Sequence, residues 1–146
     1  YPNFFAEKPV NSLIYSIAIE ENVATHDTPE KAFDMLLDEE NFVVIGRASN
    51  VAFSDKKDVI RLFISGERKQ RIEYIRKKHD ISERKAERLV AETDERRSSY
   101  QNFYTGTDWG YSENYDLCLD VTKLGVDGVV AMVELYAERM GYGKFK

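Results

Sequence analysis

Three short apolar runs stand out along the chain and predict β-strands. They are Phe42–Ile45, Val59–Ile64 and Asp116–Val121. The first, FVVI, is continuous rather than alternating, and continuous apolar runs are typical of parallel strands covered on both faces. Between and around these runs, the apolar spacing changes to the three- and four-residue period of helices.

The helical stretches carry recognisable start and stop signals. A helix is expected from Glu67 to about His79, with Ser65 able to cap it, and a second begins after Ser82 and continues toward Tyr104. A last amphipathic helix is expected over Val126–Met140 and ends at a glycine. Nearer the start of the chain, two further helices are expected, one from Asn11 and one from the pair Thr28–Pro29.

Helices alternating with apolar strands predict a single α/β domain with a parallel sheet. The length of 146 residues is that of one domain. Three strands make a small sheet for this class, so either the sheet is truncated or more strand lies upstream of Tyr1.

Charge and composition narrow the function classes. The net charge is −5, from 21 basic and 26 acidic residues, and a chain this acidic is a poor general nucleic-acid binder. Residues 67–97 are the exception, with 11 basic against 8 acidic side chains, which suits a small phosphate-bearing ligand.

No apolar run reaches the ~20 residues of a membrane span, and no secretory signal is visible. With a single cysteine, Cys118, an internal disulfide is ruled out, and a cytoplasmic protein is expected.

The first candidate site lies where the FVVI run ends. Open α/β sheets bind ligands beyond the carboxyl ends of their strands, and Gly46 and Arg47 follow this run directly. A glycine allows a sharp turn, and a guanidinium can hold a phosphate through two parallel hydrogen bonds. An ion pair with a nearby acidic side chain is an equal alternative for Arg47.

A second set of candidates lies in the arginine-rich helices. Arg68 and Arg71 are one turn apart just after the second strand, while Asp94, Arg96 and Arg97 come late in the following helix. A solvated helix face with ion pairs is the alternative interpretation, and it is favoured for other basic residues of these helices, such as Arg84 and Arg88.

In the loop TGTDWG after the helices, Trp109 is expected to pack the loop onto the rest of the domain. Cys118 is expected to be a core residue rather than a nucleophile.

Five segments together resemble one known family. They are VVIGRA at residues 43–48, VIRLFIS with the arginines after it at residues 59–71, DERRSSY at residues 94–100, TGTDWG at residues 105–110 and YDLCLDVTKLGVDGVV at residues 115–130. In this order and spacing the chain resembles the cytidylate-kinase-like family of P-loop nucleoside-monophosphate kinases, over about residues 10–140.

The resemblance implies a three-layer α/β/α fold with a parallel sheet, an arginine-rich helical lid over residues 66–104, and transfer of the γ-phosphoryl group of ATP, with Mg²⁺, to a small acceptor. By position, Gly46 and Arg47 match the contact with the acceptor phosphate, and Arg68 and Arg71 match the start of the lid. Asp94, Arg96 and Arg97 match the end of the lid that meets the transferring phosphoryl group.

The chain departs from the family pattern in two places. The first strand and the glycine-rich loop with its lysine, which supply the usual ATP and Mg²⁺ ligands, are not among these residues; in the family they lie upstream. Ala48 stands where cytidylate kinases carry an aspartate that reads cytosine. We therefore expect a kinase domain that acts on a small phosphate acceptor, with a CMP-like molecule as one candidate, and without nucleic-acid or membrane partners. The alternative is a non-catalytic regulatory or binding module with the same fold.

Overall fold

A computed structural model describes residues 43–46, 49–52, 54–55 and 57–142. Its elements run in the order α3 (Ser49–Ala52), β1 (Leu62–Ser65), α4 (Arg68–His79), α5 (Glu83–Thr105), the 3-10 turn η2 (Ser112–Asn114), β2 (Leu117–Asp120) and α6 (Val121–Met140). The helices expected from Asn11 and from Thr28–Pro29 lie outside the described residues.

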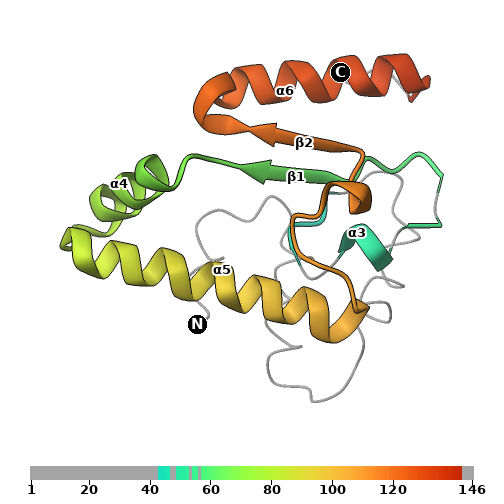
Figure 1. The fold of residues 1–146 in the computed structure, drawn as a ribbon. Helices are drawn as coiled ribbons and strands as arrows, with labels where there is room; N and C mark the ends of the chain where they lie inside the picture. Colours follow the sequence, from blue (N-terminus) through green and yellow to red (C-terminus); the bar gives the residue numbers. More distant parts are fainter. Residues whose placement is uncertain (1–42, 47–48, 53, 56, 143–146) are drawn as a thin grey trace.

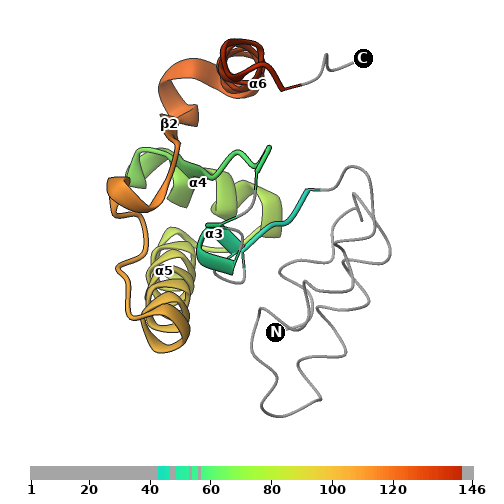
Figure 2. The same ribbon diagram turned by 90° about the vertical axis from the view of Figure 1, so that its right-hand side faces the viewer.

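The two strands β1 and β2 pair in parallel, as the sequence predicts. Their register joins Leu62 to Leu117 and Ser65 to Asp120. The long helical excursion between them is the crossover that a parallel pair requires. Figure 1 shows α6 on one side of this pair and α5 on the other, and the turned view in Figure 2 agrees. The described residues therefore form a mixed α/β structure around a two-stranded parallel sheet.

The pairing is fixed at the amino ends of the strands by one arginine and one aspartate. The Arg61 guanidinium donates from Nε and Nη2 to the Asp116 carboxylate, at 3.0 and 2.8 Å, and the Arg61 backbone N–H donates to the same carboxylate at 2.7 Å. In return, the Asp116 N–H donates to the Arg61 carbonyl oxygen at 2.8 Å. This reciprocal contact, across 55 positions of sequence, sets the register of the sheet.

One expected strand is not observed. The apolar run Phe42–Ile45 predicts a covered strand, but the described residues 43–45 form none, and Val43 and Ile45 are 60% and 63% exposed. A short apolar run shows only that its side chains could be buried; a strand also needs a neighbour to pair with, and within the described residues β1 pairs with β2 alone.

Helices α4 and α5 form an antiparallel hairpin with a small core of its own. Ile72 from α4 packs with Ala86 and Val90 from α5, and all three are buried. The hairpin turns at Asp80, which closes α4 in the left-handed conformation, and α5 begins where expected, with the Ser82 hydroxyl accepting from the Lys85 N–H. The hairpin, rather than the sheet, supplies most of the buried apolar residues of the described part.

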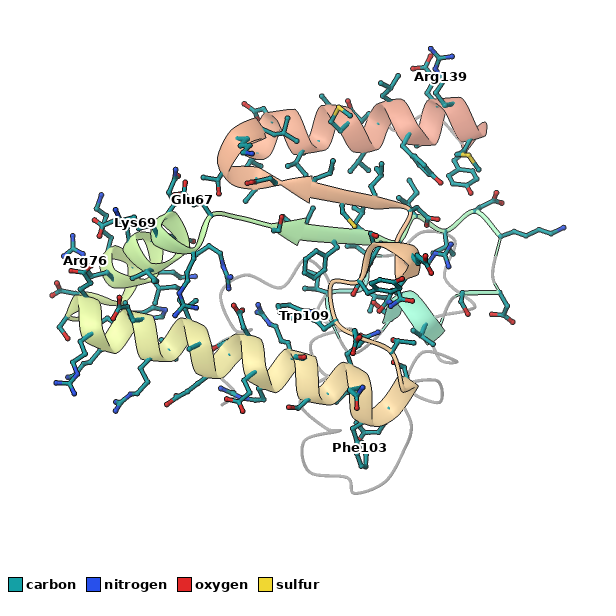
Figure 3. All side chains as sticks on the ribbon, in the orientation of Figure 1. Glu67, Lys69, Arg76, Phe103, Trp109 and Arg139 are labelled. Carbon is teal, nitrogen blue, oxygen red and sulfur yellow. The ribbon has the colours of Figure 1, made fainter. Side chains whose placement is uncertain are left out.

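The loop after α5 packs against Phe63 of β1 through Trp109, as the sequence predicts. The Trp109 and Phe63 rings meet edge to face with centroids 5.2 Å apart, and Tyr115 lies on the same ring at 5.1 Å (Figure 3). Gly110 has a φ of +79°, and a Cβ there would lie 2.8 Å from Phe63 Cζ. A glycine is therefore needed for both the turn and the close packing.

Two smaller expectations about the end of the chain are corrected. Cys118 is exposed, because the strand alternates its side chains and turns the neighbouring Leu119 into the core instead. Helix α6 begins at Val121, earlier than the expected Val126, with a break at Gly125 where φ is +69°. It ends at Gly141 as predicted. Within the described residues, no helix combines the length and apolar character of a membrane span.

Candidate functional site

The carboxyl ends of β1 and β2 lie side by side, and α4 and α6 start there (Figure 1). Figure 3 places Glu67 at the point where β1 gives way to α4. This edge is where open parallel sheets bind their ligands. The candidate site is therefore built from the hairpin residues that follow this edge.

Helix α4 begins without the expected serine cap. The residue at its N-cap position, Glu67, makes no side-chain capping bond, and the Ser65 hydroxyl donates to the Leu119 carbonyl oxygen of β2 instead, at 3.4 Å. The Glu67 N–H is satisfied from α6, where the Thr122 hydroxyl oxygen accepts it at 2.8 Å. The start of the arginine-rich hairpin is thus tied to the end of the sheet by a contact that the sequence analysis did not identify.

Two of the candidate residues meet across the hairpin. The Arg71 guanidinium of α4 donates from Nη2 to Asp94 Oδ1 of α5 at 2.6 Å. Both side chains are partly buried, with 35% and 25% of their surface exposed. A charge-assisted contact of this length and burial is stronger than an exposed surface pair. It brings together residues that are 23 positions apart in the sequence.

Arg97 belongs to the same cluster. Its pKa is lowered, first by burial and then by the positive charges of Arg71 and Arg96, while the carboxylate of Asp94 opposes the shift. Arginine stays protonated under all such shifts, so the lowered pKa means an unfavourable environment for a cation that is nevertheless present. Arg97 therefore interacts with the Arg71–Asp94 pair and with Arg96.

The remaining candidates are not gathered into this cluster. Arg68 is the first residue of α4; it is exposed and forms no salt bridge with the described residues. Gly46 makes a left-handed turn with φ at +77°, and its carbonyl oxygen accepts from the Ser49 N–H at the start of α3. Arg47 lies outside the described residues.

The short helix α3 lies at the amino ends of the strands instead. The Asn50 side chain donates to the Asn114 carbonyl oxygen at 3.5 Å, just before β2 begins. Within the described part of the chain, no strand formed by the FVVI run leads to the carboxyl edge of the sheet. The roles assigned to Gly46 and Arg47 stay predictions.

Comparisons with known proteins bear on what this arrangement is for. The model of the cytidylate kinase-like family matches residues 3–123, which is most of the chain. The chain belongs to the cytidylate kinase-like family. The match spans the hairpin, both strands and Thr122, so all the residues of the candidate site lie inside it.

A solved structure is also similar. An uncharacterized protein from Eubacterium ventriosum ATCC 27560 is 27% identical, with a TM-score of 0.68, over 94% of this chain and 72% of that chain. No curated protein matches the chain significantly. The family assignment therefore rests on the sequence match, and the solved structure shows that a protein of similar fold exists.

The sequence could have pointed to Thr122 by the same rule that singled out Gly46 and Arg47. Thr122 lies two residues after the end of β2 at Asp120, at the edge where open parallel sheets bind ligands. In this member of the cytidylate kinase-like family, the strand-end rule places Thr122 at the candidate site, and the roles of Gly46 and Arg47 stay predictions.

Proposed function

We propose that this protein transfers the γ-phosphoryl group of ATP to a small phosphorylated or hydroxylated acceptor, most simply a nucleoside monophosphate. Membership of the cytidylate kinase-like family supports the reaction class. The proposal includes the three-layer α/β/α fold of P-loop kinases and a lid formed by residues 66–104. The acceptor class stays open between CMP and related molecules, because Ala48 stands at the position expected to read cytosine.

The observation that carries the proposal is the arginine cluster around Asp94. Arg71 contacts that carboxylate at 2.6 Å, and Arg97 is half-buried among Arg71, Arg96 and Asp94. The positive charges of Arg71 and Arg96 act on Arg97, whose own charge is partly withdrawn from water. Such a cluster is stabilised by a multiply charged anion, and guanidinium groups match the geometry of phosphoryl oxygens.

The cluster suggests how the reaction would be assisted. Phosphoryl transfer needs positioning and stabilisation of charge on the moving group, with little covalent chemistry from the protein. Arg96 and Arg97 would act on the transferring group, while Asp94 would hold Arg71 in place and limit repulsion among the arginines. Arg68 would contribute from the start of the hairpin, and Gly46 with Arg47 would bind the phosphate of the acceptor.

ATP enters this proposal as the substrate, and Mg²⁺ as the ion that accompanies it. Among the described residues, no cluster of three or more His, Cys, Asp or Glu side chains could hold a metal ion. The described part of the chain does not by itself fit a Mg²⁺ site, and we derive no step through the metal.

The proposal is tested by incubating the full-length protein with ATP, Mg²⁺ and a panel of nucleoside monophosphates and other small acceptors. We expect a phosphorylated product, detected by mass, with at least one acceptor. The control is Arg97→Ala, which should abolish most of that product while the protein stays folded. Nucleotide binding without any product would instead favour the alternative, a binding or regulatory module of the same fold.

A further inference from the structure

The link between β1 and α4 consists of Gly66 and Glu67, and the Thr122 side chain bonds to Glu67 beside Gly66. The Thr122 hydroxyl oxygen accepts a hydrogen bond from the Glu67 N–H at 2.8 Å. A Cβ built on Gly66 would lie 2.9 Å from the same oxygen and 3.4 Å from Arg71 Cγ. A glycine at position 66 therefore leaves room for the Thr122 and Arg71 side chains to approach the backbone closely.

Thr122 is itself held firmly at the end of the sheet. It is the second residue of α6, and its N–H donates to the Asp120 side chain, which caps that helix, at 2.9 Å. Asp120 in turn is the last residue of β2, paired with Ser65 of β1. The hydroxyl that accepts the hydrogen bond from Glu67 is thus held close to the sheet through Asp120.

The hairpin beyond this link is one unit. Its two helices share the core of Ile72, Ala86 and Val90 and are joined again by the contact between Arg71 and Asp94. A rotation of the backbone at Gly66 and Glu67 would therefore move α4 and α5 together, with every arginine of the cluster. The other end of the hairpin leaves through Gly106, which is in the left-handed conformation with φ at +66°.

We propose that Thr122 is a positioning residue, whose hydroxyl holds the Gly66–Glu67 link and thereby sets the place of the α4–α5 hairpin and its arginine cluster against the carboxyl edge of the sheet. The consequence for catalysis rests on the proposed function, but the positioning itself does not. Thr122 acts through Arg71 and Arg97, and it is not assigned a contact with substrate.

The first experiment measures amide hydrogen exchange in the full-length protein and in two variants. Thr122→Val keeps the shape of the side chain and removes the hydroxyl, whereas Thr122→Ser keeps the hydroxyl. We expect exchange at the Glu67 amide to rise by about tenfold in Thr122→Val, because that N–H loses its acceptor, and to stay near wild type in Thr122→Ser. Equal exchange in all three proteins would overturn the proposal.

The second experiment uses the close approach at Gly66. The φ of Gly66 lies outside the left-handed region, so Gly66→Ala is opposed by neighbouring atoms rather than by the backbone conformation. We expect Gly66→Ala to lower the melting temperature in the wild-type protein and to do so much less in a Thr122→Ala background, where the nearest of those atoms is gone. Additive effects would show that Thr122 does not hold this link.

The catalytic consequence has its own measurement. Once an acceptor is identified, Thr122→Val should lower kcat by about tenfold with little change in the KM for ATP, and Thr122→Ser should restore it. Normal kcat in Thr122→Val would overturn the link between positioning and catalysis. Failure to find any acceptor would count against the proposed function, whereas the exchange and melting experiments would still decide the role of Thr122.

Discussion

Arg71 on α4 and Asp94 on α5 are joined by a 2.6 Å contact that closes the helical hairpin above the carboxyl edge of the sheet. The half-buried Arg97 interacts with both members of this pair and with Arg96. The pair stabilises the hairpin, and in the proposed reaction it would also orient a cation toward an anionic ligand.

Removal of the Asp94 charge should destabilise the protein more than removal of a neighbouring charge. Asp94→Asn removes the carboxylate that contacts Arg71 and offsets the charge of Arg97, and we expect a loss of about 1 kcal/mol in the free energy of unfolding. Glu95→Gln is the matched control, because Glu95 is exposed and adjacent. Urea denaturation at low and high salt gives the measurement, and added salt should reduce the difference by screening the arginines. Equal losses of unfolding free energy in the two variants would refute the stabilising role assigned to the Asp94 carboxylate.

The contact between Arg61 and Asp116 should make stability depend on pH in the acid range. The hydrogen bonds from Arg61 lower the pKa of Asp116 below its ordinary value, although burial opposes this. The folded protein therefore holds the Asp116 proton less readily than the unfolded chain. The stabilisation is present above the unfolded pKa of about 4 and is lost as pH falls through the lowered folded value.

Comparison of wild type with Asp116→Asn isolates this effect. The variant should be less stable at neutral pH, and the difference in unfolding free energy should shrink as pH falls below about 4. Glu95→Gln serves as the control, because Glu95 is exposed and forms no salt bridge with the described residues. A constant difference between wild type and Asp116→Asn at all pH values would contradict the assigned cause.

Two glycines with the same backbone conformation should respond differently to alanine. Gly110 and Gly106 have φ values of +79° and +66°, but only at Gly110 would a Cβ meet another residue, Phe63 Cζ at 2.8 Å. Gly106→Ala should cost about 1 kcal/mol in backbone strain, and Gly110→Ala about 1–3 kcal/mol more through overpacking. Thermal unfolding followed by the fluorescence of Trp109, the only tryptophan in the chain, measures both. Equal shifts would exclude the predicted clash.

Arg47 should matter for the acceptor and not for the fold. A bidentate contact with a phosphate contributes roughly 1.5–3 kcal/mol, so Arg47→Ala should lower kcat/KM for the acceptor by about ten- to a hundredfold. Arg47→Lys should be nearly as damaging, because lysine keeps the charge and loses the two-pronged geometry. A large fall in melting temperature with unchanged kinetics would instead assign Arg47 to a structural ion pair.

Local signals in the sequence predicted much of the described fold. The cap at Ser82, the stop at Gly141 and the long helix from Glu83 to Thr105 depend on neighbouring residues and are observed as expected. The parallel pairing of the second and third apolar runs follows from the helical excursion between them and is confirmed. The arginines of residues 68–97 stood out as an excess of charge, which needs no knowledge of the fold.

Features that depend on distant partners could not be predicted in the same way. The Glu67 N–H is satisfied by Thr122, 55 residues later, so the local choice of Ser65 as a cap was wrong. The contact between Arg71 and Asp94 depends on how two helices pack, which spacing within either helix does not reveal. The exposure of Cys118 follows from which side of the strand α6 covers, and an apolar run contains no such information.

The central claim is that the arginine cluster around Asp94 serves phosphoryl transfer. The most direct measurement is the rate of product formation from ATP and the best acceptor of the panel, compared among the full-length wild-type protein, Arg97→Ala and Arg84→Ala. Arg84 is exposed near the far end of the same helix and controls for the loss of one positive charge. We predict that Arg97→Ala lowers kcat by at least about a hundredfold, while Arg84→Ala stays within about twofold of wild type. Equal rates in the two variants, or no product from any acceptor with the wild-type protein, would contradict the account.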